Sequence, residues 1–453
     1  MTSPSSSTGD PGSQDPDLGS FSWLPLAAAT LLLSILWAGP VLLHPTASAL
    51  GAWSSEGPGH LWGLWTTAQG LWEHGPLLRV HEGVEFPDGY RAHLVDPVNL
   101  LLFLPGYALG GGGATGAVLG WNLLHLGSVT LAAIGCGLLG REIWSRTSAS
   151  SWSCALLAVS FAFNPYQWGH PFMGRTELLP VAWLPWVLTW WIRAQRSGSR
   201  RDAGIAGLFL GLCALGGSYL SVFLLLVVVP VLVWTGLRGS MHDERRERLT
   251  RLAVTGGVAL LVALPGIWAL LAAPPSGGTM GSNTPLPLYG LEDQAQLAWW
   301  FRLGSSPSQA SSWRWGLGLD QPATVGLVVL ALAVLGVIRA RDSHLLGART
   351  VAIAGAWALV LGLGWRWNLG STQLSLPAEW LSSLVPPMAS LAHWERIGPL
   401  ASLFLGVAAG HGWILLRSMS WTSRLGTRAS LVLGLGACSL VAADQATWPR
   451  AWS

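Results

Sequence analysis

The sequence predicts an all-α protein that crosses a membrane many times. Of its 453 residues, 51% are hydrophobic and only 10% are charged, whereas about a quarter of the residues in a soluble domain carry a charge. Apolar runs of about 20 residues recur along the chain, and each is long enough to cross a bilayer core of about 30 Å. Arginine-rich loops alternate with arginine-poor loops, as the two sides of a membrane protein require.

The apolar runs predict about eleven transmembrane helices within residues 23–443. They cover residues 23–43, 116–139, 150–166, 178–194, 203–217, 219–236, 252–273, 322–338, 350–365, 399–416 and 429–443. A further apolar segment, 94–109, is shorter and is interrupted by Asp96, Pro97, Asn99 and Pro105. We expect this segment to be re-entrant or interfacial; if it spans, the helices number twelve and every later loop changes sides.

Both ends of the chain are polar. Residues 1–22 are rich in Ser, Pro, Gly and Asp and predict a disordered cytoplasmic tail, while 444–453 predict a short C-terminal tail. The first apolar run is long enough for a true span, so no cleavable signal peptide is expected. The four cysteines all lie inside apolar runs, which predicts neither a disulfide nor a zinc site.

Arginine supplies all 25 basic residues, and its distribution predicts the orientation. With a cytoplasmic N-terminus and eleven spans, the inner loops contain 17 arginines and the opposite side contains 8. Because cytoplasmic loops are enriched in basic residues, this predicts a multi-pass protein of the inner (plasma) membrane. The inner loops are then 140–149, 192–202, 237–251, 339–349 and 417–428.

The scarce ionisable groups gather on the predicted outer side. A long first outer loop, 44–115, contains the stretch Val80–Leu101, with four acids, two histidines and an arginine. Further outer loops are expected at 168–177, 274–321 and 366–398. A functional site is therefore expected at the outer surface.

A carboxylate follows the first span, just before a tryptophan-rich segment. Glu56 and His60 precede Trp62, Trp65 and Trp72. Anchoring at the membrane interface accounts for the tryptophans but not for Glu56 or His60. A carboxylate close to a membrane surface is costly to desolvate, which suits a general base.

The first outer loop also contains a potential cation ligand set. His81, Glu82 and Glu85 lie close to Asp88, and carboxylate oxygens suit Mg²⁺, Mn²⁺ or Ca²⁺. The spacing matches no strict metal motif, so a solvated loop is the favoured interpretation, and a divalent-cation site near these residues is left open. Residues 86–89, Phe-Pro-Asp-Gly, predict a turn.

Two arginines are expected at the mouths of spans on the outer side. Arg175 precedes Glu177, and Arg396 follows Glu395. An arginine at such a depth usually pairs with a carboxylate or a phosphate. A structural Glu–Arg pair and a ligand site are both left open here.

The sequence gives little reason to expect a nucleotide or nucleic-acid partner. Gly111, Gly113 and Gly116 match the dinucleotide-binding spacing, but no strand precedes them and no acidic residue follows in a βαβ context. A flexible glycine-rich entry to a span is the better interpretation.

The order of these motifs resembles the glycosyltransferase C superfamily of polytopic membrane proteins. The resemblance covers roughly residues 23–416 and is strongest over 53–190. Its motifs are the acid before HLWGLW, then FPDG, DPVNLLLFLPGYALGG, GWNLLHL and FAFNPYQWGHPFMGRTELLPVAWLPW.

The resemblance implies a polytopic core with a large first outer loop that carries an essential acid. It implies a polyprenyl-phosphate sugar as donor and transfer with inversion at the anomeric carbon. By position, the catalytic acid would be Glu56, with Asp88 or Asp96 as alternates. The superfamily has an Asp or an acid-x-acid pair where this chain has a lone Glu56, which is a departure from its pattern.

The resemblance also implies cationic groups that hold the lipid phosphate. These would be Arg91, Arg175 and Arg396, with His60 and Glu177 as further substrate-binding residues. Two functions follow: an envelope glycosyltransferase, or a non-catalytic protein of envelope assembly that carries, flips or organises lipid-linked glycans. Only the first function needs the acid, and no protein partner is predicted for either.

Overall fold

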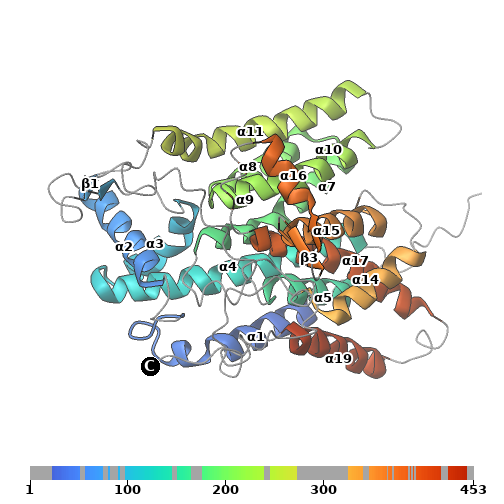
Figure 1. Ribbon diagram of the computed structural model, residues 1–453. Coiled ribbons are helices and arrows are strands. Elements are labelled where there is room, and N and C mark those ends of the chain that lie inside the picture. The colour runs from blue at the N-terminus through green and yellow to red at the C-terminus, as the bar shows by residue number, and fades with distance from the viewer. Residues whose placement is uncertain are drawn as a thin grey trace, which may run out of the picture.

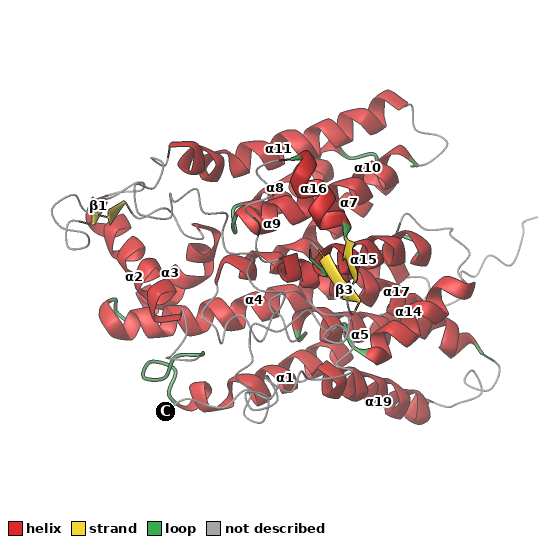
Figure 2. Ribbon diagram, viewed as in Figure 1, coloured by secondary structure: helices red, strands yellow, loops and turns green. Residues whose placement is uncertain are grey.

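A computed structural model describes most of the helical chain. The described residues are 23–51, 57–74, 80–81, 90–91, 97–144, 150–164, 176–238, 245–272, 325–339, 346–364, 366–369, 372–385, 388, 391, 394–419 and 427–445. Helices make up nearly all of them, and many of the helices lie side by side in one bundle (Figures 1 and 2). The prediction of an all-α architecture is confirmed for this part of the chain.

Each predicted span coincides with one helix or with consecutive helical segments. The α-helices are α1 (Leu24–Leu43), α2 (Gly57–His74), α3 (Leu100–Leu109), α4 (Gly113–Trp144), α5 (Ser150–Ala162), α7 (Leu184–Ser197), α8 (Arg200–Ala214), α9 (Ser218–Phe223), α10 (Val229–Leu237), α11 (Arg245–Ala272), α14 (Leu327–Arg339), α15 (Ala348–Gly362), α16 (Pro377–Leu384), α17 (Gly398–Ser418) and α19 (Thr427–Gln445). Short 3₁₀ segments are η1 (Pro97–Asn99), η2 (Thr176–Trp183) and η6 (Trp394–Ile397), and η3 (Leu224–Val228) is a π-helix.

Four helices are long and apolar enough to cross a membrane, judged by length and composition among the described residues. They are Gly113–Trp144, Tyr219–Leu237, Arg245–Ile267 and Gly398–Ser418. Six further apolar helices are shorter, at 10–17 residues.

The segment expected to be re-entrant forms η1 and α3, which fold back along the first half of α4. Ten residues of α3 extend about 15 Å, half the thickness of a bilayer core of about 30 Å. The two helices approach closely through glycines, because a Cβ atom on Gly106 would lie 2.7 Å from the Cα of Gly120. One on Gly110 would lie 2.6 Å from the Cα of Gly116. Small residues permit such contact between helix backbones.

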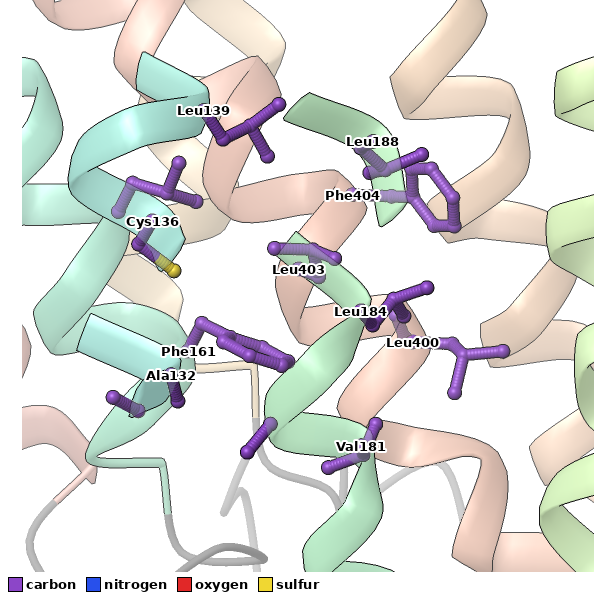
Figure 3. Close-up of a cluster of buried hydrophobic side chains, with 14 of the residues drawn as sticks. Ala132, Cys136, Leu139, Phe161, Val181, Leu184, Leu188, Leu400, Leu403 and Phe404 are labelled. Carbon is purple, nitrogen blue, oxygen red and sulfur yellow. The ribbon is translucent and has the colours of Figure 1, made fainter. Parts of the chain in front are cut away.

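The core centres on α17, which packs against α5, α14 and α15. Every residue from Gly398 to Gly410 is buried. Its Leu400, Leu403 and Phe404 lie among apolar side chains of α4, α5, η2 and α7 in Figure 3. A helix that is apolar on all sides is expected at the centre of such a bundle.

Two short antiparallel hairpins lie in segments predicted as outer loops. In the first, β1 (Val80–His81) pairs with β2 (Tyr90–Arg91); the turn predicted at 86–89 lies outside the described residues. In the second, β3 (Arg366–Leu369) pairs with β4 (Thr372–Ser375). The sequence reading missed this second hairpin, although its two-residue Gly-Ser connection is a common hairpin signal.

The predicted span at 219–236 is not one uniform helix. The π-helix η3 separates α9 from α10, and the Val229 amide donates to the Leu224 carbonyl five residues back. The wider turn leaves carbonyl groups for other donors, and Trp357 Nε1 of α15 donates to the Leu226 oxygen at 3.2 Å. Such π-segments within α-helices often lie beside functional sites.

Candidate functional site

Five side chains from four separate segments meet at the starts of α2, η2, α9 and η6. They are His60, Thr176, Glu177, Tyr219 and Arg396, and we call them the outer cluster. Sequence separations reach 219 residues between Glu177 and Arg396. The fold therefore assembles this cluster from distant parts of the chain.

The Glu177 carboxylate lies at the centre of the outer cluster. Arg396 donates from Nη1 to Glu177 Oε1 at 3.1 Å, and His60 Nε2 lies 3.8 Å from Oε2. The other ring nitrogen of His60, Nδ1, is hydrogen-bonded to the Thr176 hydroxyl at 2.9 Å. About a fifth of the side-chain surface of His60 and of Glu177 is exposed, against 9% for Arg396. A ligand arriving from solvent would thus meet the carboxylate and the imidazole first.

The Arg396 guanidinium stacks on an aromatic ring. Its central carbon lies 4.9 Å from the centre of the Tyr219 ring. Tyr219 in turn lies 6.3 Å from Phe223, and Phe223 lies 5.9 Å from the buried Trp394, ring centre to ring centre. Guanidinium groups stack favourably on aromatic faces. The charge of Arg396 is therefore held in position by the Tyr219 ring and by Glu177.

The turn between α8 and α9 packs against η2, the segment that carries Glu177. Gly216 has no room for a side chain, because a Cβ atom would collide with the Pro180 ring in η2. Gly217 adopts a φ of 145°, a backbone conformation that residues other than glycine rarely adopt. The Cys213 thiol donates to the Pro180 carbonyl at 3.3 Å. Proline and glycine at these positions thus let the turn dock directly on η2.

A buried asparagine ties the predicted re-entrant segment to the outer cluster. Asn99, at the end of η1, donates from Nδ2 to the Thr176 carbonyl at 2.8 Å. Only 2% of its surface is exposed. The segment after Asp96 is therefore fixed against the same residues that contact His60 and Glu177.

A second polar network, which we call the first-loop anchor, fixes the chain after α1 against α4. Asn122 accepts from the Leu50 amide at 2.9 Å and donates to the Pro45 and Ser48 carbonyls at 2.8 Å. Trp121 Nε1 donates to the Leu50 carbonyl at 2.6 Å. This network holds the chain six residues before Glu56.

The structure brings together three of the predicted site residues. His60, Glu177 and Arg396 are all members of the outer cluster. The sequence left open whether Arg396 pairs with a carboxylate, and the partner found is Glu177. Four predicted residues, Glu56, Asp88, Asp96 and Arg175, lie outside the described residues, as does the side chain of Arg91 on β2. The roles that the resemblance implies for them stay predictions.

Sequence reasoning missed the neutral residues of both networks. Thr176 and Tyr219 carry no charge, so a search for ionisable groups passes over them. Asn99, Trp121 and Asn122 lie in motifs that carry the resemblance, DPVNLLLF and GWNLLHL, but received no role. Asparagine inside an apolar run was the available signal, since a buried amide needs partners.

The described residues contain no group of three or more His, Cys, Asp or Glu side chains arranged to hold a metal ion. The divalent-cation site left open near His81, Glu82 and Glu85 involves side chains that the described part of the chain does not include. In the outer cluster, the chemistry available is a carboxylate, an imidazole and a guanidinium. These groups bind hydroxyls and phosphates and can move a proton.

No protein-family model matches the chain, and no curated protein shows significant sequence similarity to it. The function must therefore be inferred from the residues of the chain itself.

Proposed function

We propose that the protein is a membrane glycosyltransferase. It would transfer a sugar from a polyprenyl-phosphate donor to an envelope glycan, lipid or protein at the outer surface, with inversion at the anomeric carbon. The observation that best supports this is the outer cluster: His60, Glu177 and Arg396 converge at the ends of apolar helices. A lipid-linked donor has its sugar at the membrane surface, next to the hydrocarbon core. A cationic side chain beside the leaving phosphate would stabilise the negative charge that develops on it.

The proposed topology has eleven spans, a cytoplasmic N-terminus and a glycosyltransferase C-like core. It is supported by the meeting of three predicted inner loops, 140–149, 192–202 and 237–251, at one end of the helices. Contacts of Glu142 with Arg193 and of Arg200 with Glu247 join these loops. Loops on one side of a membrane must meet in this way.

The proposed roles follow from what each group can reach. Glu177, oriented by Arg396, accepts hydrogen bonds from sugar hydroxyls, and His60 contacts the same sugar. Arg91 and Arg175 are the candidates that hold the donor phosphate. Arg396 was also a candidate, but its pairing with Glu177 favours a positioning role.

In the proposed reaction Glu56 is the general base, with Asp88 and Asp96 as alternates. The base takes the proton of the acceptor hydroxyl. The acceptor oxygen then attacks the anomeric carbon from the face opposite the phosphate, and the C–O bond to the phosphate breaks. The polyprenyl phosphate leaves with the bonding electron pair, and its charge is stabilised by arginine.

The alternative is a non-catalytic carrier, flippase or scaffold for lipid-linked glycans. The ion pair between Arg396 and Glu177 gives this alternative its support, because the pair also holds η2 and η6 together without any chemistry. The two functions differ in their need for Glu56.

A complementation experiment separates them. Cells that lack the gene receive the wild-type protein, Glu56→Gln, or the control Glu73→Gln, a carboxylate in the same predicted outer loop. Envelope glycans and polyprenyl-phosphate sugars are then measured by mass spectrometry. A transferase predicts that Glu56→Gln fails to restore the glycan and accumulates the donor, while Glu73→Gln restores it. Full restoration by Glu56→Gln would favour the carrier.

A further inference from the structure

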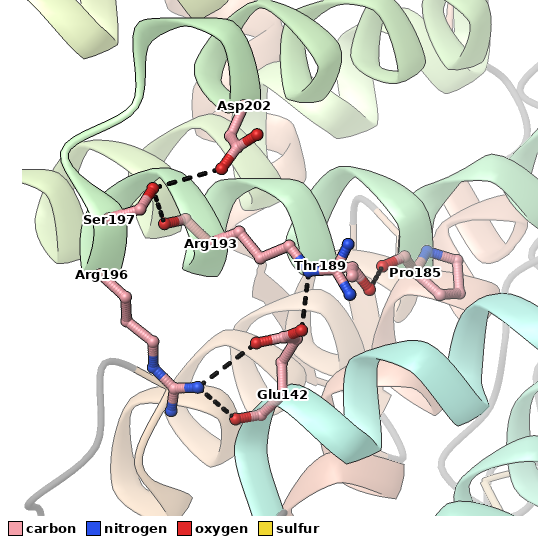
Figure 4. Close-up of polar contacts among 7 residues, drawn as sticks. All are labelled: Glu142, Pro185, Thr189, Arg193, Arg196, Ser197 and Asp202. Atoms are coloured by element: carbon pink, nitrogen blue, oxygen red, sulfur yellow. Dashed lines mark hydrogen bonds and ion pairs between the residues drawn. The ribbon is translucent and has the colours of Figure 1, made fainter.

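The most highly charged surface lies at the opposite end of the helices from the outer cluster. It is formed by the ends of α4, α7 and α10 and the starts of α8 and α11, and we call it the basic end. Glu142 of α4 lies between two arginines of α7: Arg193 Nε donates to Oε1 at 2.7 Å, and Arg196 Nη1 donates to the Glu142 carbonyl at 2.6 Å (Figure 4).

Further contacts join α8, α10 and α11 to this surface. Arg200 Nη2 of α8 lies 2.9 Å from Glu247 Oε1 of α11. Arg248 of α11 donates to the Leu237 carbonyl at the end of α10 at 2.8 Å. The five helix ends therefore form one continuous, rigid surface rather than separate loops.

By sequence, arginines outnumber carboxylates at the basic end. Nine arginines lie between residues 193 and 251, against the described Glu142, Asp202 and Glu247 and, outside the described residues, Asp243 and Glu244. Glu142 and Glu247 already pair with other arginines. Three of the nine, Arg201, Arg245 and Arg246, are exposed and have no acidic partner among the described residues.

The position of these arginines adds to the imbalance. Arg201 lies in the first turn of α8, and Arg245 and Arg246 begin α11. A cation in the first turn of a helix is disfavoured by the helix dipole. The fold therefore gathers positive charge where its own backbone opposes it, and an external anion would offset both effects.

Two tryptophans stack on arginines of the basic end. Arg193 stacks on Trp190 at 4.8 Å, and Arg238 stacks on Trp234 at 3.9 Å, measured to the ring centres. Trp234 is 48% exposed. Tryptophan is enriched at membrane surfaces, with its ring at the head-group level. Below it α11 exposes apolar side chains, among them Leu260, Leu261 and Leu264.

We propose that the basic end binds the head groups of anionic phospholipids, through Arg201, Arg245 and Arg246. The ligand chemistry is a phosphodiester, to which guanidinium groups bind in two-point contacts. A lipid is favoured over a soluble phosphate because α11 continues from Arg245 and Arg246 along exposed leucines, beginning with Leu249 one turn on, against which an acyl chain can lie. This site is separate from the outer cluster and independent of the proposed transferase activity.

Lipid titrations followed by native mass spectrometry test the proposal. The full-length protein in a neutral detergent is titrated with phosphatidylglycerol and with phosphatidylcholine of the same acyl chains. Each arginine beside an anionic surface contributes about 1 kcal/mol, or about fivefold in affinity. The triple variant Arg201→Gln/Arg245→Gln/Arg246→Gln should therefore lose about a hundredfold in phosphatidylglycerol affinity. Its phosphatidylcholine affinity should not change.

Three controls sharpen the result. Replacing the same three arginines by Lys keeps the charge and should keep most of the affinity. Arg349→Gln removes an exposed arginine on α15 and should change the affinity by less than about twofold. Glycerol 3-phosphate should not compete with the lipid. Equal binding of the two lipids by the wild type, wild-type phosphatidylglycerol affinity in the Gln variant, or full competition by glycerol 3-phosphate would each overturn the proposal.

Discussion

Replacing Arg396 by Gln should destabilise the protein through the charge it leaves behind. Both partners of the pair are largely shielded, with 9% of the Arg396 side chain and 19% of the Glu177 side chain exposed. Removing one partner of such a pair costs about 3–5 kcal/mol. The remaining exposure of Glu177 and the nearby His60 ring lower this to the bottom of the range. The lost contact with the Tyr219 ring adds about 1 kcal/mol. We therefore expect about 4 kcal/mol for Arg396→Gln.

The double variant Glu177→Gln/Arg396→Gln should be more stable than Arg396→Gln alone. It leaves no uncompensated carboxylate, so we expect it to recover about 2 kcal/mol. The assay is urea denaturation in mixed micelles, followed by tryptophan fluorescence, with the free energy of unfolding taken from the transition. Arg349→Gln serves as the control and should stay within about 0.5 kcal/mol of the wild type. Glu177→Gln is measured alone as well; if its effect and that of Arg396→Gln simply add in the double variant, the two side chains are not coupled and the reasoning is refuted.

Three further perturbations test other parts of the structure. Asn122→Ala removes three of the four hydrogen bonds of the first-loop anchor and should cost about 3 kcal/mol by the same urea assay; a loss below about 1 kcal/mol contradicts the anchor. Gly120→Ala places a methyl group 2.8 Å from the Phe103 carbonyl and should cost about 1–3 kcal/mol, whereas Gly256→Ala, with nothing within 4 Å, should not destabilise. In a cysteine-free background, an impermeant thiol reagent applied to intact cells should label a cysteine at 310 but not at 245; labelling at 245 rejects the orientation.

The helices were predictable because their signal is local. A long apolar run is by itself enough to predict a buried or membrane-spanning helix, so α4 and α17 follow directly from composition and length. The π-helix η3 within 219–236 was not predictable, because its free carbonyl is bonded by Trp357, which is far away in the sequence. The hairpin at Arg366–Ser375 was missed because strands of four residues are too short to form an apolar run.

The sequence predicted which charged residues belong to the candidate site, but not which of them contact one another. Charge in an otherwise apolar chain singled out His60, Glu177 and Arg396, since such groups are costly to bury without a partner. Their pairing depends on how helices 219 residues apart pack together, which no local pattern encodes. Neutral residues, such as Thr176 in the cluster and Asn99 beside it, differ from ordinary core residues only once their partners are known.

The proposed transferase activity is tested most directly by transfer in vitro. Membrane vesicles that contain the full-length wild-type protein or Glu56→Gln are supplied with a panel of radiolabelled polyprenyl-phosphate sugars and with envelope fragments as acceptors. Label is followed from the lipid fraction into the acceptor, and the anomeric configuration of the product is determined. We predict that the wild type transfers at least one sugar with inversion, and that Glu56→Gln binds the same donor but transfers none. Equal transfer by Glu56→Gln, or a product with retained configuration, would contradict the proposed function.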